Sequence, residues 1–219
     1  MATRTLLAEL SVVHCQAHGQ AVAMESVGGV DAARRVQASE AFDMVVLASD
    51  AIDTLIASGQ VLAGSRVDLV HSGVAVAVQG GTVPPDIGSE DAVRSAVLAA
   101  RSISYSTGPS GVALVKLFER WGIADSIKER VVQAPPGVPV GALLARGEVE
   151  LGFQQLSELI HLDGITIVGP LPAAIQITTT FSGAVCATST RPELVRSLLA
   201  FMASGAALEA KKRQGMEPA

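Results

Sequence analysis

Residues 28–59 read GGVDAARRVQASEAFDMVVLASDAIDTLIASG, and this stretch decides the fold class. Its centre, Met44–Ala48, is a continuous apolar run of five residues, which is typical of a strand buried on both faces. A glycine-pair turn leads into a helix before this strand, and Ser49 or Asp50 begins a second helix that Gly59 ends. Strands and helices that alternate through short turns predict an α/β fold.

The composition supports this class and excludes disorder. Of the 219 residues, 49% are hydrophobic and 17% charged, whereas disordered chains combine low hydrophobicity with high net charge. Aromatic residues make up only 3%, so the core must consist of Ala, Val, Leu and Ile. The 21 glycines and 10 prolines indicate many tight connections between short elements.

The charge pattern argues against a nucleic-acid partner. Sixteen Lys and Arg against 21 Asp and Glu give a net charge of −5, without the basic, aromatic-rich stripe of nucleic-acid binders. The one basic cluster, Lys211-Lys212-Arg213, ends a predicted helix, where cations suit the helix dipole. We therefore expect no nucleic acid among the partners.

No metal, cofactor or membrane segment is expected either. Cys15 and Cys186 fit no metal-ligand spacing, and His14 and His18 share a helix face without an acidic or cysteine partner nearby. No run of about 20 apolar residues is present, which argues against membrane insertion. Glu9 interrupts the first apolar run, so no secretory signal is recognised, which leaves a cytoplasmic protein or a chain that starts downstream of its true beginning.

Two long predicted strands suggest two lobes. They cover residues 67–79 and 176–188 and bracket a central block with its own strand–helix units. We expect lobe 1 to comprise residues 1–79 and 175–219, and lobe 2 residues 80–174. The two lobes should form a clamshell that closes through changes in the backbone angles of a few hinge residues. Val74–Val78 should then lie beside Thr178–Ser182. Shorter strands are expected at Ala21–Glu25, Ser102–Ser106, Val131–Gln133, Leu151–Gln155 and Ile165–Val168.

The stretch SYSTGPSG, residues 104–111, is the strongest candidate ligand site. It places small hydroxyl residues and glycines between a strand and a helix predicted from Val112 to Trp121. Free backbone N–H groups and the positive end of the helix dipole form an anion site at such a turn. We expect Thr107, Gly108, Ser110 and Gly111 to contact the ligand, and an ordinary capped turn is the alternative.

Three more strand–helix junctions carry similar residues: Glu25–Gly29, which includes Gly28 as a further candidate contact, Pro136–Gly141 and Gly152–Gln155. Ligands of open α/β sheets sit outside the carboxyl ends of strands, so four such junctions could form a ring of neutral donors. No known catalytic motif is present. Glu25 and His71 are the acid–base candidates if the protein is an isomerase, and a structural role is the alternative for both.

Several blocks resemble the periplasmic molybdate-binding proteins, which have the type II periplasmic-binding-protein fold. They are Ala32–Val61, GPSGVALVKLFERWGI at Gly108–Ile123, VPVGALLARGEVELGFQQLSEL at Val138–Leu159, and the closing KRQGMEPA. The similarity covers most of the chain. Carried over position by position, it implies an oxyanion shell at Gly29, Ser110, Val138 and Gln155, with the Gln155 amide donating from the opposite wall.

The resemblance implies a monomeric periplasmic solute-binding protein that holds a small anion without a cofactor and serves an ABC permease. The sequence begins at the family's first helix, so the first strand and its serine loop are expected to be missing. Gly29 replaces a family serine and Gln155 a family tyrosine, changes that suit a small carboxylate as well as a molybdate-like oxyanion. We expect a binding protein rather than an enzyme. Some relatives resemble isomerases of unsaturated tricarboxylates, so the alternative is an isomerase of the aconitate type.

Overall fold

The computed structural model describes residues 2–135 and 137–219, and the chain divides into two compact units. Unit 1 comprises Met1–Ser72 and Thr179–Ala219, and unit 2 comprises Gly73–Thr178. The chain crosses between the units within the long strand β2 (Val67–Gln79) and again at the start of strand β6 (Thr178–Val185). Each unit contains strands and covering helices, which confirms the predicted α/β class.

The sheet of unit 1 places β6 between β1 (Met44–Ala48) and the first half of β2, and β7 (Met216–Pro218) pairs with β2. Strands β1 and β6 are antiparallel, with Met44 opposite Val185 and Ala48 opposite Phe181. Because successive side chains of a strand point to opposite faces, the apolar run of β1 supplies two cores. Val45 and Leu47 pack in one core, and Met44 and Val46 pack against the other.

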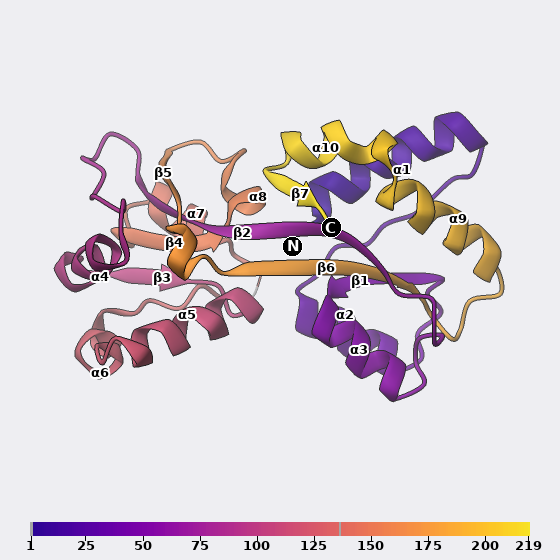
Figure 1. Cartoon of the computed structure of the whole chain (residues 1–219), viewed down its shortest axis with the longest axis horizontal. Coiled ribbons are helices and arrows are strands. Elements are labelled where there is room, and N and C mark those ends of the chain that lie inside the picture. The colour runs from indigo at the N-terminus through magenta and orange to yellow at the C-terminus, as the bar shows by residue number, and fades with distance from the viewer. Residues whose placement is uncertain (1, 136) are drawn as a thin grey trace. The chain divides into compact units, whose positions relative to one another are not determined.

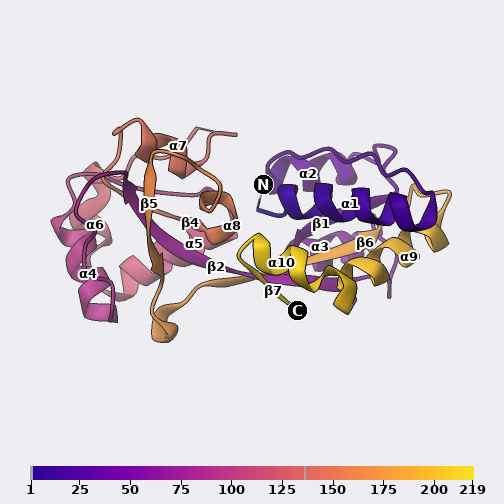
Figure 2. The ribbon, with the colours of Figure 1, turned by 90° about the horizontal axis from the view of Figure 1, so that it is seen from above.

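Helices cover both faces of this sheet, as Figure 1 shows. Helices α2 (Gly29–Gln37) and α3 (Ser49–Ala57) pack on the face of Val45 and Leu47. The other face carries α1 (Arg4–His18), α9 (Pro192–Ala203) and α10 (Leu208–Arg213). Helix α1 packs against both α9 and α10, which Figure 2 shows from above.

Unit 2 has a mixed sheet in the order β5–β2–β4–β3. The second half of β2 pairs antiparallel with β4 (Leu151–Gln155) and with β5 (Ile165–Pro170), with an irregularity between Val76 and Ala77. Strand β3 (Ile103–Tyr105) pairs with β4 in parallel. The carboxyl ends of β3 and β4 therefore lie at the same edge of the sheet.

The two faces of this sheet again carry separate helices. Helices α4 (Glu90–Ala99), α5 (Pro109–Arg120) and α6 (Ala124–Ile127) pack with the alternate β2 residues Val74, Val76 and Val78. Helices α7 (Val140–Ala145) and α8 (Leu156–Leu159) pack on the other face, against Ala75 and Ala77. The short side chains on that face allow close approach of α7.

Three local predictions were wrong. Ala21–Glu25 is not a strand but an irregular segment, although Val22 and Met24 pack against the core of unit 1. Val131–Gln133 contributes only an isolated bridge between Val131 and Ile103. The helix expected from Val112 begins three residues earlier, because Pro109 is pre-organised for the first helical turn and takes that position.

The prediction that Val74–Val78 lies beside Thr178–Ser182 was also wrong, because it placed the contact in the wrong half of β2. Val74–Val78 pairs with β4 and β5 inside unit 2. The part of β2 that contacts β6 is the preceding half in unit 1, where the Ser182 hydroxyl donates to the Asp68 carboxylate at 2.6 Å and His71 Nδ1 lies 3.0 Å from Thr180 Oγ1. Each half of β2 finds its partners within its own unit.

The residues of the basic cluster near the C-terminus lie in different environments. Lys212 and Arg213 pair with Glu209 and Glu9. Lys211, by contrast, is only 1% exposed, and burial lowers the pKa of its ammonium group. It lies on the face of α10 that packs into unit 1 rather than on the solvent face.

A charge network around Asp68 ties α3, β2 and β6 together, and it predicts a pH-dependent loss of stability. Arg66 Nε donates to Asp68 at 2.9 Å and its NH1 to Asp53 at 2.7 Å. Arg66, followed by the Ser182 hydroxyl, lowers the pKa of Asp68. A carboxyl with a lowered folded-state pKa stabilises the fold above its unfolded pKa, near 4, and loses this contribution as the pH falls through the folded value.

We predict that Asp68→Asn lowers the melting temperature at pH 7 and that its difference from the parent protein shrinks below about pH 3. An exposed ion-pair network contributes up to about 1 kcal/mol, which corresponds to about 2–4 °C for a chain of this size. Thermal unfolding followed by circular dichroism from pH 2 to 8 checks this. Asp163→Asn, at an exposed turn, is the control and should have no effect. A difference that is constant with pH would contradict the prediction.

Candidate functional site

The turn between β3 and α5 is held in a tight conformation by Gly111. A Cβ atom built at Gly111 would lie 1.7 Å from the carbonyl oxygen of Ser106, so no side chain fits there. The N–H groups of Gly111 and Val112 both donate to the Gly108 carbonyl, at 3.0 and 3.2 Å. The hydroxyls of Ser106 and Ser110 lie 3.1 Å apart, which closes the turn on its own side chains.

This turn presents unused donors at the start of a long helix. The backbone N–H groups of Thr107, Gly108 and Ser110 make no hydrogen bond to any residue in 2–135 or 137–219. Helix α5 has 12 residues and no acidic residue in its first turn, so its positive dipole end is not compensated locally. Such an arrangement favours an anion.

Helix α2 in unit 1 offers a weaker version of the same feature. Gly28 precedes the helix and Gly29 is its first residue, as the sequence implied. However, Asp31 lies in the first turn and binds Arg34 at 2.8 Å, which already places a carboxylate near the dipole end. The two predicted glycines can therefore offer backbone donors, but Asp31 already compensates the positive dipole end of α2.

The predicted residues of unit 2 gather at one edge of its sheet. Helix α5 follows β3, and Gln155 ends the neighbouring parallel strand β4, so Ser110 and Gln155 belong to the same unit. That Gln155 donates to the ligand stays a prediction. Gln155 is 4% exposed and follows Phe153 on the face of the sheet that α5 covers.

The turn before α7 contains Val138, whose backbone N–H was expected to donate to the ligand. Pro136 lies outside the described residues. The N–H of Val138 donates to the Pro135 carbonyl at 3.0 Å, so this donor is already used within the turn. Val138 itself packs against the core on the α7 face.

The two acid–base candidates from the sequence both lie in unit 1. Glu25 has a side chain that is 64% exposed and accepts a hydrogen bond from Arg35 at 2.6 Å. His71 is half-buried on β2 and contacts Thr180, as described above. No hydrogen bond or ion pair joins Glu25 to His71 within the described chain.

A partly buried carboxyl group that the sequence did not predict, that of Glu158, lies at the same sheet edge of unit 2 as Ser110 and Gln155. The amide of Gln154 donates from Nε2 to Glu158 Oε2, and its Oε1 accepts from the N–H of Gly141 at 3.3 Å. Burial raises the pKa of Glu158 above the ordinary value for glutamate. The repeated glutamines that end β4, directly before a helix, were the available signal, because buried amides orient a neighbouring carboxylate.

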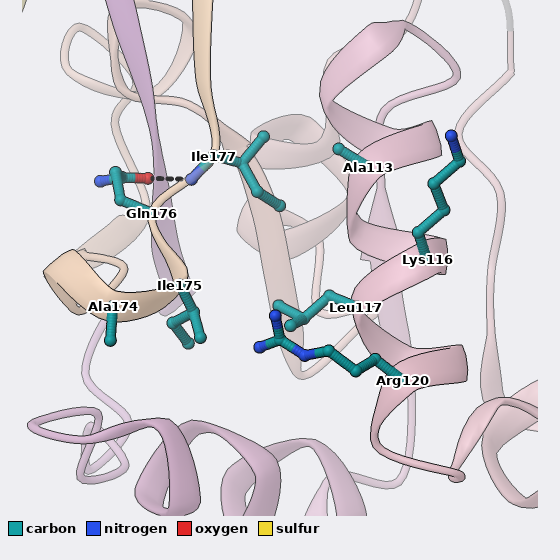
Figure 3. A pocket seen from close by; sticks show the side chains of 8 residues that line it. All are labelled: Ala113, Lys116, Leu117, Arg120, Ala174, Ile175, Gln176 and Ile177. Atoms are coloured by element: carbon teal, nitrogen blue, oxygen red, sulfur yellow. Dashed lines mark hydrogen bonds between the residues drawn. The ribbon is translucent and has the colours of Figure 1, made fainter.

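A pocket of about 320 Å³ also opens on unit 2, but it does not contain the predicted residues. Figure 3 shows that it lies between α5 and residues 174–177, with Leu117, Ile175 and Ile177 as apolar walls. Two of its polar groups are already engaged: Gln176 Oε1 accepts from the N–H of Ile177 at 2.9 Å, and Arg120 binds Glu90 at 2.6 Å. We therefore place the candidate site at the N-terminus of α5 and not in this pocket.

The described part of the chain shows no cluster of three or more His, Cys, Asp or Glu residues that could hold a metal ion. His14 lies near His18, with ring centroids 4.5 Å apart, and its Nε2 contacts Gln20 Oε1 at 3.1 Å. Both cysteines are free, and burial raises the pKa of Cys186 to about 11. Among residues 2–135 and 137–219, no helix combines the length and apolar character that a membrane span needs.

Comparison with protein families agrees with this architecture. The model for the bacterial extracellular solute-binding proteins matches residues 1–217. The chain belongs to this family. One curated relative is the aconitate isomerase of a Pseudomonas species, which is 44% identical over 187 residues, covering 84% of this chain and 70% of the relative.

Solved structures confirm the type II periplasmic-binding-protein fold that the sequence resemblance implied. The periplasmic molybdate-binding protein of Azotobacter vinelandii matches with a TM-score of 0.81 and 19% identity, covering 98% of this chain and 95% of that one. PEB3 bound to L-phospholactate matches with a TM-score of 0.75 and 13% identity, covering 99% and 96%. At these identities the likeness establishes the fold.

The unused donors at α5 predict how variants of Ser110 bind an anion. Ser110→Pro removes one N–H and, because a residue before proline avoids the helical region, strains Pro109. We expect at least a tenfold loss of affinity for small polycarboxylates, equivalent to about 1.4 kcal/mol. Ser110→Ala keeps the N–H and should lose less. Calorimetric titration with aconitate, citrate and molybdate measures both, and equal affinities for parent and Ser110→Pro would contradict the prediction.

Proposed function

We propose that this protein binds a small unsaturated tricarboxylate of the aconitate type and interconverts its isomers. The observation that carries the proposal is the 44% identity, over 84% of this chain, to a protein named aconitate isomerase. The site chemistry is compatible with this substrate class, since the α5 N-terminus offers neutral donors for a carboxylate.

Neutral donors suit an isomerase because they need not lose their own protons. Backbone N–H groups and serine hydroxyls bind a carboxylate without themselves titrating near neutral pH. When a proton is removed from a carbon next to a carboxylate, negative charge spreads onto that group. A helix N-terminus stabilises such developing charge, so the α5 turn can both bind the substrate and lower the barrier.

Glu25 and His71 remain the acid–base candidates that the sequence itself suggested. The hydrogen bond of His71 to Thr180 would fix the orientation of its ring, and the Glu25 carboxylate accepts a hydrogen bond from Arg35. Both residues belong to unit 1. Their involvement is part of the proposal and can be tested by substitution in the assay below.

A second candidate function is transport of a small anion, with a periplasmic location and an ABC permease as partner. It is favoured by membership of the extracellular solute-binding family, whose description concerns binding and not catalysis. In this case, the same α5 turn would hold a molybdate-like oxyanion or a small carboxylate. Binding without turnover distinguishes it from the isomerase.

We predict that the purified protein converts cis-aconitate into the trans isomer and the reverse, without an added cofactor. Proton NMR follows both vinyl signals as a function of time, and a heat-denatured sample provides the control. An accelerated approach to the same isomer ratio from either direction supports the isomerase. Thermal stabilisation by aconitate with no conversion would support the binding protein, and stabilisation by molybdate alone would overturn the choice of substrate.

A further inference from the structure

The side chain of Gln176 lies close to the point where the chain leaves unit 2. This unit begins at Gly73, within β2, and ends at Thr178, the first residue of β6. We call these two places the crossings: the first comprises Gly73 and Val74, and the second residues 176–178. Figure 3 shows the Gln176 side chain on the side away from α5, so its amide does not point into the pocket described above.

The Gln176 amide binds the backbone of both crossings. Its Oε1 accepts from the N–H of Ile177 at 2.9 Å and from the N–H of Val74 at 3.2 Å. Its Nε2 donates to the carbonyl of Leu171 at 3.4 Å. The same segments are also joined directly, because Val74 N–H donates to the Ile177 carbonyl at 3.0 Å and Leu171 N–H to the Val74 carbonyl at 3.1 Å. The amide therefore completes a compact group of bonds between β2 and residues 171–177.

The partners of this amide fix its orientation. A carbonyl oxygen can accept two hydrogen bonds, and Oε1 receives two N–H groups, one from each crossing. The NH₂ end faces the Leu171 carbonyl, which can only accept. A glutamate at this position would place a carboxylate oxygen against that carbonyl, and an apolar residue would leave the Ile177 N–H without this acceptor. Glutamine thus matches the partners at both ends.

The glycine at the first crossing makes room for this amide. A Cβ atom built at Gly73 would lie 3.1 Å from Gln176 Nε2, which is tighter than an ordinary contact. Gly73 does not have a positive φ, so its backbone conformation alone does not require glycine. Glycine inside a strand often marks a place where another group approaches closely. The close approach of Gln176 accounts for the glycine here.

We propose that Gln176 is a clip that couples the two crossings, so that a backbone change at one of them releases the other. Hinge motions of proteins are absorbed by a few residues that change their backbone angles. Val74 and Ile177 lie at the two crossings, and each offers its N–H to the same oxygen. A rotation of either peptide breaks its own bond and removes a restraint on the other segment. The clip applies to an isomerase and to a binding protein alike.

The position of the clip allows it to open without unfolding a core. Gln176 is half-buried, so water can replace the partners of its amide. The neighbouring part of β2 is held differently, by a continuous ladder of five paired residues with β4. Because local opening is easiest where backbone bonds are near solvent, we expect the crossings to open more often than this ladder.

Gln176→Met keeps the length of the side chain and removes both ends of the amide. Amide hydrogen exchange of the ¹⁵N-labelled protein without ligand should be at least tenfold faster at Ile177. Val74 should be accelerated less, by about threefold, because its N–H keeps the Ile177 carbonyl as acceptor. The amide of Val76, in the same strand, should stay within about twofold of the parent protein. Gln133→Met, at an exposed glutamine of unit 2, is the matched control and should change none of these rates.

Gly73→Ala tests the coupling from the first crossing. Alanine costs less backbone entropy than glycine, so without the close approach this variant should slow exchange or leave it unchanged. The clip predicts the opposite result, which is faster exchange at Ile177 in the second crossing. It also predicts no further acceleration when Gly73→Ala is combined with Gln176→Met, because both substitutions remove the same interaction.

Three results would overturn the proposal. The first is unchanged exchange at Ile177 in folded Gln176→Met. The second is equal acceleration of all amides in unit 2, which would show a general loss of stability, and the third is additive acceleration in the double variant, which would show independent crossings. If Gln176→Met does not fold, Gly73→Ala decides alone: faster exchange at Ile177 supports the clip, and unchanged or slower exchange overturns it.

Discussion

The contact between Gly111 and the Ser106 carbonyl is the constraint on which the candidate site depends. With 1.7 Å between that oxygen and the position of a Cβ atom, only glycine allows the first turn of α5 to close over the end of β3. The N–H groups of Thr107, Gly108 and Ser110 lie at this turn and have no carbonyl partner among the described residues, as is usual at the start of a helix. The proposed anion site therefore depends on the absence of a side chain at Gly111.

The sheet of unit 2 carries different polar groups on its two faces. The face of α5 carries neutral donors and Gln155, which suit the binding of a carboxylate. The face of α7 and α8 carries the amide–carboxyl pair of Gln154 and Glu158. Because consecutive residues of β4 point to opposite faces, Gln154 and Gln155 serve different sides of the same edge. Both groups lie near the edge where β3 and β4 end.

Much of this fold could be predicted from local sequence. The apolar run Met44–Ala48 and the SYSTGPSG turn are specified by side-chain type and by the conformations that glycine, proline and serine favour, and the structure has a strand and a helix start there. Ala21–Glu25 shows why a pattern alone is insufficient, since a strand also needs a neighbour with which to pair. The half-strand error in β2 has the same origin, because the pairing partner of each half depends on contacts far apart in the sequence.

The features of the site that the sequence did not predict also depend on how separate segments of the chain pack together. The environment of Glu158 depends on Gln154 and on Gly141 at the start of α7, and the pair of glutamines that ends β4, three residues before Glu158, is the one local signal of it. The use of the Val138 N–H by Pro135 depends on the exact shape of one turn. Lys211 is buried although its two neighbours Lys212 and Arg213 are exposed, because burial depends on the face of α10 on which the residue lies.

A titration of the ¹⁵N-labelled protein with cis-aconitate, followed by the backbone amide resonances, tests the central claim most directly. The account predicts saturable shifts of the Thr107, Gly108 and Ser110 amides, larger than those of residues lining the pocket around Ile175 and Leu117. All shifts should give one dissociation constant. Saturable binding that leaves these three amides unchanged would show that the ligand is held elsewhere and would contradict the account.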